Sequence, residues 1–367
     1  MEWFKVKNVH KIDSPSLLIY PKRIQHNIRT LIRVVDNTPK RLCLHVKTHK
    51  MEEVIKMQLE AGIERFKCAT ISELEMTLRA GAKNVLIAYQ MVGPKISRFI
   101  SVVEKFPDAK IASLIDDWEI ANQLNSAFAE KDLIASIYLD LNNGMNRTGL
   151  PLNEDTFSFV KKLTRLTNLQ LKGVHVYDGH FRDSNLSQRK KGSDMAFRPI
   201  YALLDRIENE LTLKMEVISG GSPSFSSAAM RKDVICSPGT VLLWDVGYST
   251  IVPELNLQCA AILLTRIISK PAQGLVTVDL GHKSVGSENP IEKRVKFLNL
   301  DNYQVYKHSE EHLILKVTNW DNIKVGQVLY AIPYHVCPSV ALHDEAHVIR
   351  NNEWADTWQV AARGRRI

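Results

Sequence analysis

The sequence lacks a disulfide pattern and a long apolar run. It has 5 cysteines in 367 residues, scattered without the short spacings of metal or redox motifs. An odd, scattered set favours free thiols in a reducing compartment such as the cytoplasm. The apolar runs are short and interrupted by charges, so no membrane-spanning helix is expected. Residues 1–5 carry an acid and begin no long apolar stretch, so no secretory signal is expected either.

Blocks of like charge are also missing. The formal net charge is +8, but lysines and arginines alternate with acids along the chain. No zinc-finger or RNA-binding signature accompanies them, which argues against a nucleic-acid partner. A mildly basic surface suits an anionic small-molecule substrate or a phosphorylated cofactor. With 45% hydrophobic and 24% charged residues, the chain has the composition of a globular protein.

Short apolar runs alternate with helical patterns over roughly the first two thirds of the chain. The expected strands are the run before Lys47, then 66–69, 85–88, 111–115, 136–141, 172–176 and 215–218, with 234–236 or 241–244 as the eighth. Repeated strand–helix units of this number predict an α/β fold with a parallel (β/α)₈ barrel of the TIM type. An open doubly wound sheet is the alternative, although the usual G-x-G-x-x-G after its first strand is missing.

Two further patterns concern the helices and the end of the chain. Pro21 is expected to begin a helix, and Ser72 with Glu75 predicts a capping box for a later one. Beyond about residue 245, β-type runs follow one another at 257–268, 274–280, 294–298, 303–306, 312–317 and 327–332. They predict a second, smaller antiparallel β domain. The expected domains are 15–245 for the barrel, and 246–367 together with 1–14 for the β domain.

Residues 42–50 read Leu-Cys-Leu-His-Val-Lys-Thr-His-Lys and place Lys47 at the carboxyl end of an apolar β-type run. A lysine held at a strand end inside an α/β protein can lose solvation, and its amine then becomes available for a Schiff base. Taken alone, a solvated loop lysine is the alternative.

The turn at residues 219–222, Ser-Gly-Gly-Ser, follows the strand expected at 215–218. Two glycines let backbone N–H groups approach an anion closely, and the loop after the seventh barrel strand is a common phosphate site. Residues 238–240 follow the next strand and could complete such a cradle. An ordinary tight turn is the alternative for each segment.

Arg147, Tyr177 and His180 follow two neighbouring strands. Arg147 stands in a loop between glycines and can donate to a cofactor ring. Tyr177 can pack against a cofactor, and His180 can act as a general base. A surface arginine, a buried tyrosine and a hydrogen-bonded core histidine are the alternatives.

His335 and Cys337 stand two residues apart near the end of the β-rich region. In an extended strand they would project to the same side and offer a nitrogen and a sulfur ligand suited to zinc. Core or surface residues without a ligand are the alternative.

Together, these segments resemble the D-threonine aldolase and D-serine dehydratase family of pyridoxal 5'-phosphate (PLP) enzymes over essentially residues 12–350. The resemblance implies an alanine racemase-like barrel with a β domain, a homodimer, and a small β-hydroxy D-amino acid as substrate. It puts the Schiff base on Lys47 rather than Lys50; His180, the candidate general base, is the second expected catalytic residue. The cofactor-binding residues that it implies are Lys47, Arg147, Tyr177, Ser219, Gly220, Gly221 and Ser222. It implies a divalent metal on His335 and Cys337: zinc, or alternatively manganese or magnesium.

The reaction stays open between two outcomes. Cys337 resembles the metal pair of the dehydratases, and aldolases tend to carry a histidine close to where this chain has Asp183. Tyr177 to His180 and residues 338–344 look closer to aldolases. The leading hypothesis is retro-aldol cleavage to glycine and an aldehyde; the alternative is β-elimination to a keto acid and ammonia. An amino-acid racemase and a non-catalytic PLP carrier are further hypotheses, although no racemase-like Tyr-Gly-Asp-Gly segment is present.

Overall fold

The computed structural model describes residues 2–364 of the chain, which form two compact units. The barrel unit comprises residues 31–47 and 55–239, and the β unit comprises residues 2–30, 48–54 and 240–364. The domain limits expected from the sequence, 15–245 against 246–367 with 1–14, stay a prediction, because the two units exchange short segments and share no single boundary.

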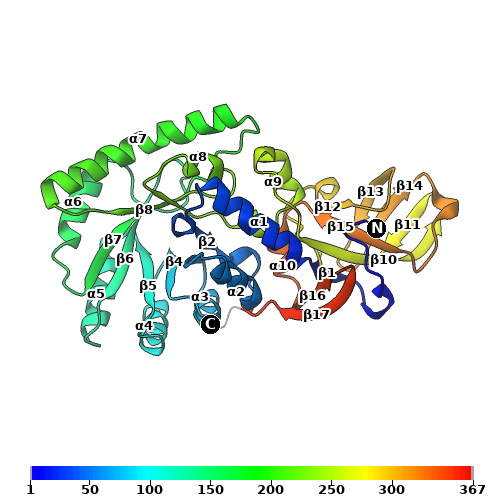
Figure 1. Ribbon diagram of the computed structural model, residues 1–367, viewed down its shortest axis with the longest axis horizontal. Coiled ribbons are helices and arrows are strands. Elements are labelled where there is room, and N and C mark those ends of the chain that lie inside the picture. The colour runs from blue at the N-terminus through cyan, green and yellow to red at the C-terminus, as the bar shows by residue number, and fades with distance from the viewer. Residues whose placement is uncertain (1, 365–367) are drawn as a thin grey trace. The chain divides into compact units, whose positions relative to one another are not determined.

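The barrel unit contains an eight-stranded sheet in which every strand is parallel to its neighbours (Figure 1). Its strands are β2 (Cys43–His45), β3 (Arg65–Cys68), β4 (Asn84–Gln90), β5 (Lys110–Ile115), β6 (Ala135–Leu141), β7 (Leu169–Val176), β8 (Glu216–Ser219) and β9 (Val234–Cys236). A parallel bridge between Leu42 and Cys236 joins the first strand to the last. The His45 N–H group donates to the Pro238 carbonyl at 2.9 Å beside that bridge. The predicted (β/α)₈ barrel is therefore confirmed.

Of the two candidates for the eighth strand, 234–236 is confirmed as β9 and 241–244 is wrong. Thr240–Leu242 forms a 3-10 turn, and all three of its side chains are buried. A fully buried apolar run carries no periodicity that separates a strand from a helical turn, which is why the sequence left both options open.

Helices follow most of the strands and flank the sheet (Figure 1). They are α2 (Glu52–Glu60), α3 (Ile71–Arg79), α4 (Lys95–Lys105), α5 (Trp118–Ala129), α6 (Glu154–Leu163), α7 (Leu186–Leu211) and α8 (Phe225–Ala229), whereas α1 (Pro21–Val34) begins in the β unit and ends in the barrel unit. The helix at Pro21 begins as expected. Within residues 2–364, no helix is both long and apolar enough to span a membrane.

The capping box predicted at Ser72 and Glu75 is wrong, because α3 begins two residues earlier. Thr70 is the N-cap, and its hydroxyl accepts a hydrogen bond from the Glu73 N–H group at 3.1 Å. The Glu73 carboxylate in turn accepts from the Ala69 N–H group at 2.6 Å. A Thr-x-x-Glu pattern thus precedes the Ser-x-x-Glu pattern by two residues. The Thr-x-x-Glu pattern forms the cap, because the chain enters α3 directly after β3.

The β unit contains a sheet with the strand order β13–β14–β11–β10–β1–β16–β17. In addition, β15 pairs with β10 and with β12. Its strands are β1 (Ser16–Ile19), β10 (Ala261–Ala272), β11 (Leu275–Val278), β12 (Val295–Phe297), β13 (Tyr303–His308), β14 (Leu313–Val317), β15 (Val328–Pro333), β16 (Glu345–Arg350) and β17 (Glu353–Gln359). Each run expected between residues 257 and 332 overlaps one of these strands. The pairing is antiparallel as predicted, except that β1 runs parallel to β16.

Side chains near the amino terminus complete the core of the β unit. Phe4 packs with Tyr330 at a ring-centroid distance of 5.3 Å, and the Tyr20 hydroxyl donates to the Phe4 carbonyl at 2.6 Å. The unit also contains the helices α9 (Val246–Ile251) and α10 (Val336–Val340). The remaining regular segments of the chain are the 3-10 turns Val9–Lys11, Pro39–Arg41, Val46–Thr48, Pro253–Leu255, Ile291–Lys293 and Trp320–Asn322.

Candidate active site

A cavity of about 490 Å³ opens at the carboxyl end of the barrel strands, the end at which barrel enzymes hold their active sites. Lys47 lines it from the 3-10 turn Val46–Thr48, just beyond the end of β2. The Lys47 backbone N–H group donates to Nδ1 of His45 at 3.3 Å. The complete lining consists of His45, Lys47, Lys67, Ala69, Ala88, Tyr89, Gln90, Val92, Leu114, Asp116, Asp140, Arg147, Thr148, His175 and Tyr177.

Arg147 and Tyr177 both line this cavity and contact each other. The Arg147 guanidinium carbon lies 4.4 Å from the centre of the Tyr177 ring, which is a cation–π distance. The Arg147 loop is shaped by Asn142, whose side-chain oxygen accepts from the Gly144 and Asn146 N–H groups at 3.1 and 3.0 Å. The structure therefore brings three of the residues singled out in the sequence, Lys47, Arg147 and Tyr177, to one cavity.

The Ser219–Ser222 turn leaves the end of β8 and is not part of the cavity lining. Gly220 has a φ of +94°, which a residue with a side chain adopts only with strain. A side chain at Gly221 would begin 3.0 Å from the Tyr177 ring, so the turn lies against that tyrosine. Ser222 accepts a hydrogen bond from the Gly239 N–H group at 3.4 Å, which links this turn to the one after β9.

One buried atom in this turn fits an anionic group. The Ser219 hydroxyl is fully buried and has no hydrogen-bond partner among residues 2–364. An unpaired buried hydroxyl costs free energy unless a ligand or water completes it. Together with the positive φ of Gly220, which lets the backbone turn closely at this point, it fits the phosphate end of PLP.

Asp178 was not singled out in the sequence, yet it holds the turn in place. Its buried carboxylate accepts from the Ser224 hydroxyl and from the Gly221 N–H group, the latter at 3.2 Å. Burial raises the pKa of Asp178 above its ordinary value, and the hydrogen bond from Ser224 opposes that shift. Asp178 directly follows Tyr177, and an acid after a strand gave no signal that it would turn inward.

His180 is placed differently from Lys47. It does not line the cavity, and its ring packs on Phe181 with a centroid distance of 4.0 Å. Its Nδ1 atom is buried and has no hydrogen-bond partner in the part of the chain that the structure describes. The assignment of His180 as a base stays a prediction.

Four buried polar residues of the cavity were missed: His45, Lys67, Asp140 and His175. Asp140 and His175 Nδ1 are 2.7 Å apart, and the His175 Nε2 atom has no hydrogen-bond partner among the described residues. Lys67 donates to the Ser237 hydroxyl at 2.6 Å. Strand parity was the available signal, because His45 and His175 stand two residues before Lys47 and Tyr177 and so point to the same side.

The electrostatics of these groups follow from burial and pairing. Burial lowers the pKa of Lys67 to about 8. Burial also lowers the pKa of His175, although the hydrogen bond to Asp140 opposes the shift. For Asp140, burial is the largest effect and acts to raise the pKa. The hydrogen bonds from His175 and Thr148, together with the charges of His175 and Arg147, outweigh it, so the pKa is lowered. An ionised Asp140 therefore fixes the His175 ring, and its Nε2 atom is left as the polar group toward a ligand.

The extended strand predicted for His335 and Cys337 is wrong. β15 ends at Pro333, His335 is the residue before α10, and Cys337 lies inside that helix. The Val336 N–H group donates to the Asp245 carboxylate at 3.0 Å, which caps the helix start. A five-residue helix of this kind depends on a distant carboxylate, and local sequence carries no signal for it.

The two side chains nevertheless meet. The His335 imidazole and the Cys337 thiol are hydrogen-bonded; this raises the pKa of His335 to about 9 against the effect of burial and lowers that of Cys337. The Cys337 Sγ atom lies 3.1 Å from the Thr48 hydroxyl and 3.4 Å from that of Thr240, and Thr48 directly follows Lys47 in the chain. Glu288 contacts Nδ1 of His335.

Within residues 2–364 there is no cluster of three or more histidine, cysteine, aspartate or glutamate side chains arranged for a metal. The pair His335 and Cys337 therefore offers two protein ligands, with the remaining positions open to water or substrate. An imidazole nitrogen and a thiolate suit zinc, and a carboxylate such as Glu288 on the far nitrogen is the usual partner of a metal-binding histidine. This donor set fits a divalent metal.

Comparisons with known proteins agree with this architecture. Residues 19–243 match the model of the alanine racemase N-terminal domain, and residues 260–349 match that of a serine dehydratase domain. A 3-hydroxy-D-aspartate aldolase of Paracoccus denitrificans is 25% identical over 97% of this chain and 93% of its own length. A D-threo-3-hydroxyaspartate dehydratase of a Delftia species is 28% identical over 74% of this chain and 72% of its own length.

Among solved structures, D-threonine aldolase from Filomicrobium marinum superposes with a TM-score of 0.87 at 22% identity, covering 96% of each chain. The first domain model spans more than half of the sequence and coincides with the barrel strands. The chain thus belongs to the alanine racemase N-terminal domain family. Within that family it is similar to D-threonine aldolases and to 3-hydroxyaspartate aldolases and dehydratases.

Proposed function

We propose that this protein is a PLP- and divalent-metal-dependent lyase that cleaves β-hydroxy D-amino acids to glycine and an aldehyde. The observation that carries the proposal is the cavity at the carboxyl end of the barrel, where Lys47 stands with Arg147, Tyr177 and the buried His175. The pair of His335 and Cys337, which lies in a serine dehydratase-type domain, favours a metal-dependent lyase over an amino-acid racemase. The aldolase and dehydratase names of the relatives support the same substrate class.

The residues divide the work by their chemistry. Lys47 would hold PLP through its amine, and Ser219 with the Gly220–Gly221 turn would hold the phosphate. Arg147 and Tyr177 would bound the ring. PLP supplies an electron sink for bonds at the substrate Cα atom, and the metal supplies a Lewis acid for the β-hydroxyl oxygen.

A proton acceptor then decides the reaction. If a base such as His180 takes the hydroxyl proton, the Cα–Cβ bond breaks, an aldehyde leaves, and a proton added at Cα gives glycine. If the Lys47 amine takes the Cα proton instead, the hydroxyl leaves as water, and hydrolysis of the unsaturated amine gives a 2-oxo acid and ammonia. The Delftia dehydratase favours keeping this second reaction as the alternative.

Product analysis distinguishes these reactions. The purified protein would be incubated with PLP, with zinc, manganese or magnesium, and with D-threonine. Glycine plus acetaldehyde supports the aldolase, whereas 2-oxobutanoate plus ammonia replaces it with the dehydratase. Exchange of the Cα proton without cleavage would indicate a racemase, and bound PLP without any turnover would indicate a non-catalytic carrier.

The same proposal includes a homodimer acting in the cytoplasm, as the family resemblance implies. Sedimentation of the PLP-loaded protein would test the dimer, and a mass of about 42 kDa, that of one chain of 41.7 kDa, would contradict it.

A further inference from the structure

A second and larger cavity lies at the amino end of the barrel strands, the end opposite to Lys47. Its volume is about 840 Å³, which lies within the range of small-molecule sites. It is lined by the first residues of six strands: Cys43, Arg65, Asn84, Lys110, Ala135 and Glu216. Because the strands are all parallel, this lining shares no residue with the cavity around Lys47.

Small side chains leave the room for this cavity. A barrel interior is normally filled by layers of bulky branched residues. In this barrel the layer below the Lys47 cavity includes Cys43 and Ala112 beside Leu86 and Tyr138, and all four also line the lower cavity. The floor of the cavity is therefore the apolar core of the barrel.

Its acids are already paired. The Glu216 carboxylate accepts two hydrogen bonds from the Arg65 guanidinium, both at 2.9 Å, and one from the Tyr138 hydroxyl at 2.6 Å. The hydrogen bonds from Arg65 lower the pKa of Glu216, so this acid stays ionised and neutralises the arginine. The second lining acid, Glu104, lies 3.8 Å from the Lys131 ammonium.

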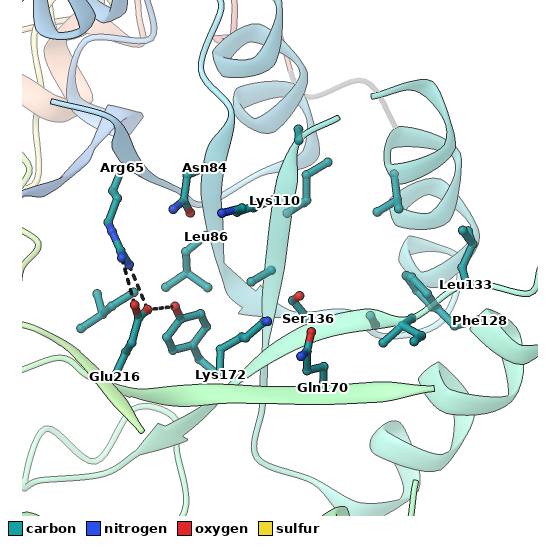
Figure 2. Close-up of a pocket in the computed structure, with 18 of the residues that line it drawn as sticks. Arg65, Asn84, Leu86, Lys110, Phe128, Leu133, Ser136, Gln170, Lys172 and Glu216 are labelled. Carbon is teal, nitrogen blue, oxygen red and sulfur yellow. Dashed lines mark hydrogen bonds and ion pairs between the residues drawn. The ribbon is translucent and has the colours of Figure 1, made fainter. Parts of the chain in front are cut away.

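Two cations remain. Lys110 and Lys172 line the cavity, and within the described range 2–364 the ammonium group of neither forms a hydrogen bond or an ion pair. The charge of Lys172 also helps to lower the pKa of Glu216. Figure 2 shows both side chains reaching into the space between the Arg65–Glu216 pair and the Phe128 ring. Ser136 and Gln170 add polar groups on the same side (Figure 2). The charged groups left without an ion-pair partner are thus both cations.

Part of the lining is apolar. Phe128 and Leu133 lie at one end of the cavity and Leu86 lies near the Arg65–Glu216 pair (Figure 2). Leu86 and Ile218 also belong to the apolar core of the barrel. Two ammonium groups together with aromatic and aliphatic side chains in one lining match a ligand with an anionic head and an apolar body. We propose that this cavity is a second ligand site, for a small amphipathic organic anion such as an aryl or branched-chain carboxylate or phosphate ester.

Calorimetric titration with phenyl phosphate tests the site. The protein is first saturated with PLP, so that phosphate binding near Lys47 is blocked. Phenyl phosphate is expected to bind at least fivefold more tightly than either inorganic phosphate, which has the charge alone, or phenol, which has the ring alone. Equal affinity for phenyl phosphate and inorganic phosphate, or no measurable binding of phenyl phosphate, overturns the proposal.

Variants locate the binding. The double variant Lys110→Ala/Lys172→Ala is expected to bind phenyl phosphate at least tenfold more weakly, while Lys110→Arg/Lys172→Arg stays within about threefold of the parent. Lys161→Ala/Lys162→Ala removes the same charge from the exposed face of α6 and should leave binding unchanged. An equal loss of affinity for phenyl phosphate in both alanine variants would show that the effect comes from net charge alone, and it would overturn the proposal.

A crystal structure of the phenyl phosphate complex keeps the proposal falsifiable if the alanine pair does not fold. Ligand density between Lys110 and Lys172 supports the site, and density elsewhere alone contradicts it. The result is independent of the reaction at Lys47, because a protein without lyase activity would still bind phenyl phosphate at the amino end of its barrel.

Discussion

At the scale of single residues, Lys47 and Lys50 stand three positions apart in one segment but have different surroundings. Lys47 lines the cavity at the carboxyl end of the barrel. Lys50 adopts a left-handed backbone conformation with a φ of 54°, and its carbonyl accepts from the Ala362 N–H group at 3.3 Å within the β unit. The cavity therefore favours Lys47 as the attachment point of PLP.

Lys47→Ala is expected to remove the Schiff-base absorbance of PLP and to lower turnover by roughly a thousandfold, since no amine is left to carry the cofactor. Lys67→Met is the control inside the same cavity, because the Lys67 nitrogen already donates to Ser237. The Schiff-base absorbance of PLP should persist in Lys67→Met. A band retained in Lys47→Ala and lost in Lys67→Met would move the attachment to Lys67.

His49 predicts a pH dependence of stability. It is fully buried, its Nδ1 atom accepts from the Met51 N–H group at 3.1 Å, and burial lowers its pKa to about 3. The unfolded chain takes up the proton first, near pH 6.5, so this contribution to stability is complete above that pH and is lost as the pH falls toward 3. Between pH 7.5 and pH 5 the loss is about 2 kcal/mol.

His49→Asn removes this titration, and its amide oxygen can still accept from Met51. Urea unfolding at pH 7.5 and pH 5 should show a pH effect smaller by about 2 kcal/mol than in the parent. His312→Asn, at an exposed position, serves as the control and should leave the pH effect unchanged. An unaltered pH effect in His49→Asn would show that this buried ring is not the titrating group.

At the scale of elements, the start of α3 separates two overlapping capping patterns. Thr70→Ala should lower the free energy of unfolding by about 1 kcal/mol, because the Glu73 N–H group loses its acceptor. Ser72→Ala removes the hydroxyl that the sequence pattern favoured and should change stability by less than about 0.5 kcal/mol. Urea midpoints measure both variants; a larger cost for Ser72→Ala would contradict the cap seen in the structure.

Strands were easier to predict than the way in which they end. The positions of seven barrel strands follow from short apolar runs, because a strand buried on both faces needs them, and the eighth was narrowed to two candidates. The ends depend on partners elsewhere in the chain, as at α10, where Asp245 binds the Val336 N–H group 91 residues away. The prediction that His335 and Cys337 share a strand was wrong for this reason.

At the scale of the whole molecule, the residues proposed for PLP belong to the barrel unit, and those proposed for the metal belong to the β unit. The two groups can therefore be removed separately. Treatment with a chelator, or His335→Asn, should lower turnover of D-threonine at least a hundredfold while the absorbance of PLP on Lys47 persists. His343→Asn is a control in the same unit, since its ring contacts the Ser284 carbonyl. Full activity after verified metal removal would contradict a metal-dependent lyase.

The sequence by itself determined the class of fold and the proposed attachment residue. Strand and helix periods, the strand count and the segment around Lys47 are local patterns, and local backbone physics makes them readable. The same holds for the turn at Gly220 and Gly221, where a positive φ and a close approach to Tyr177 require glycine.

Only the tertiary structure decided which polar groups share a cavity. His45, Lys67, Asp140 and His175 come from four different strands and meet because the sheet closes between Leu42 and Cys236. Closure also creates the second cavity at the amino end, where Lys110 and Lys172 remain beside an already satisfied Glu216. Burial and pairing of this kind arise from contacts between residues far apart in the chain, and a single sequence does not record those contacts.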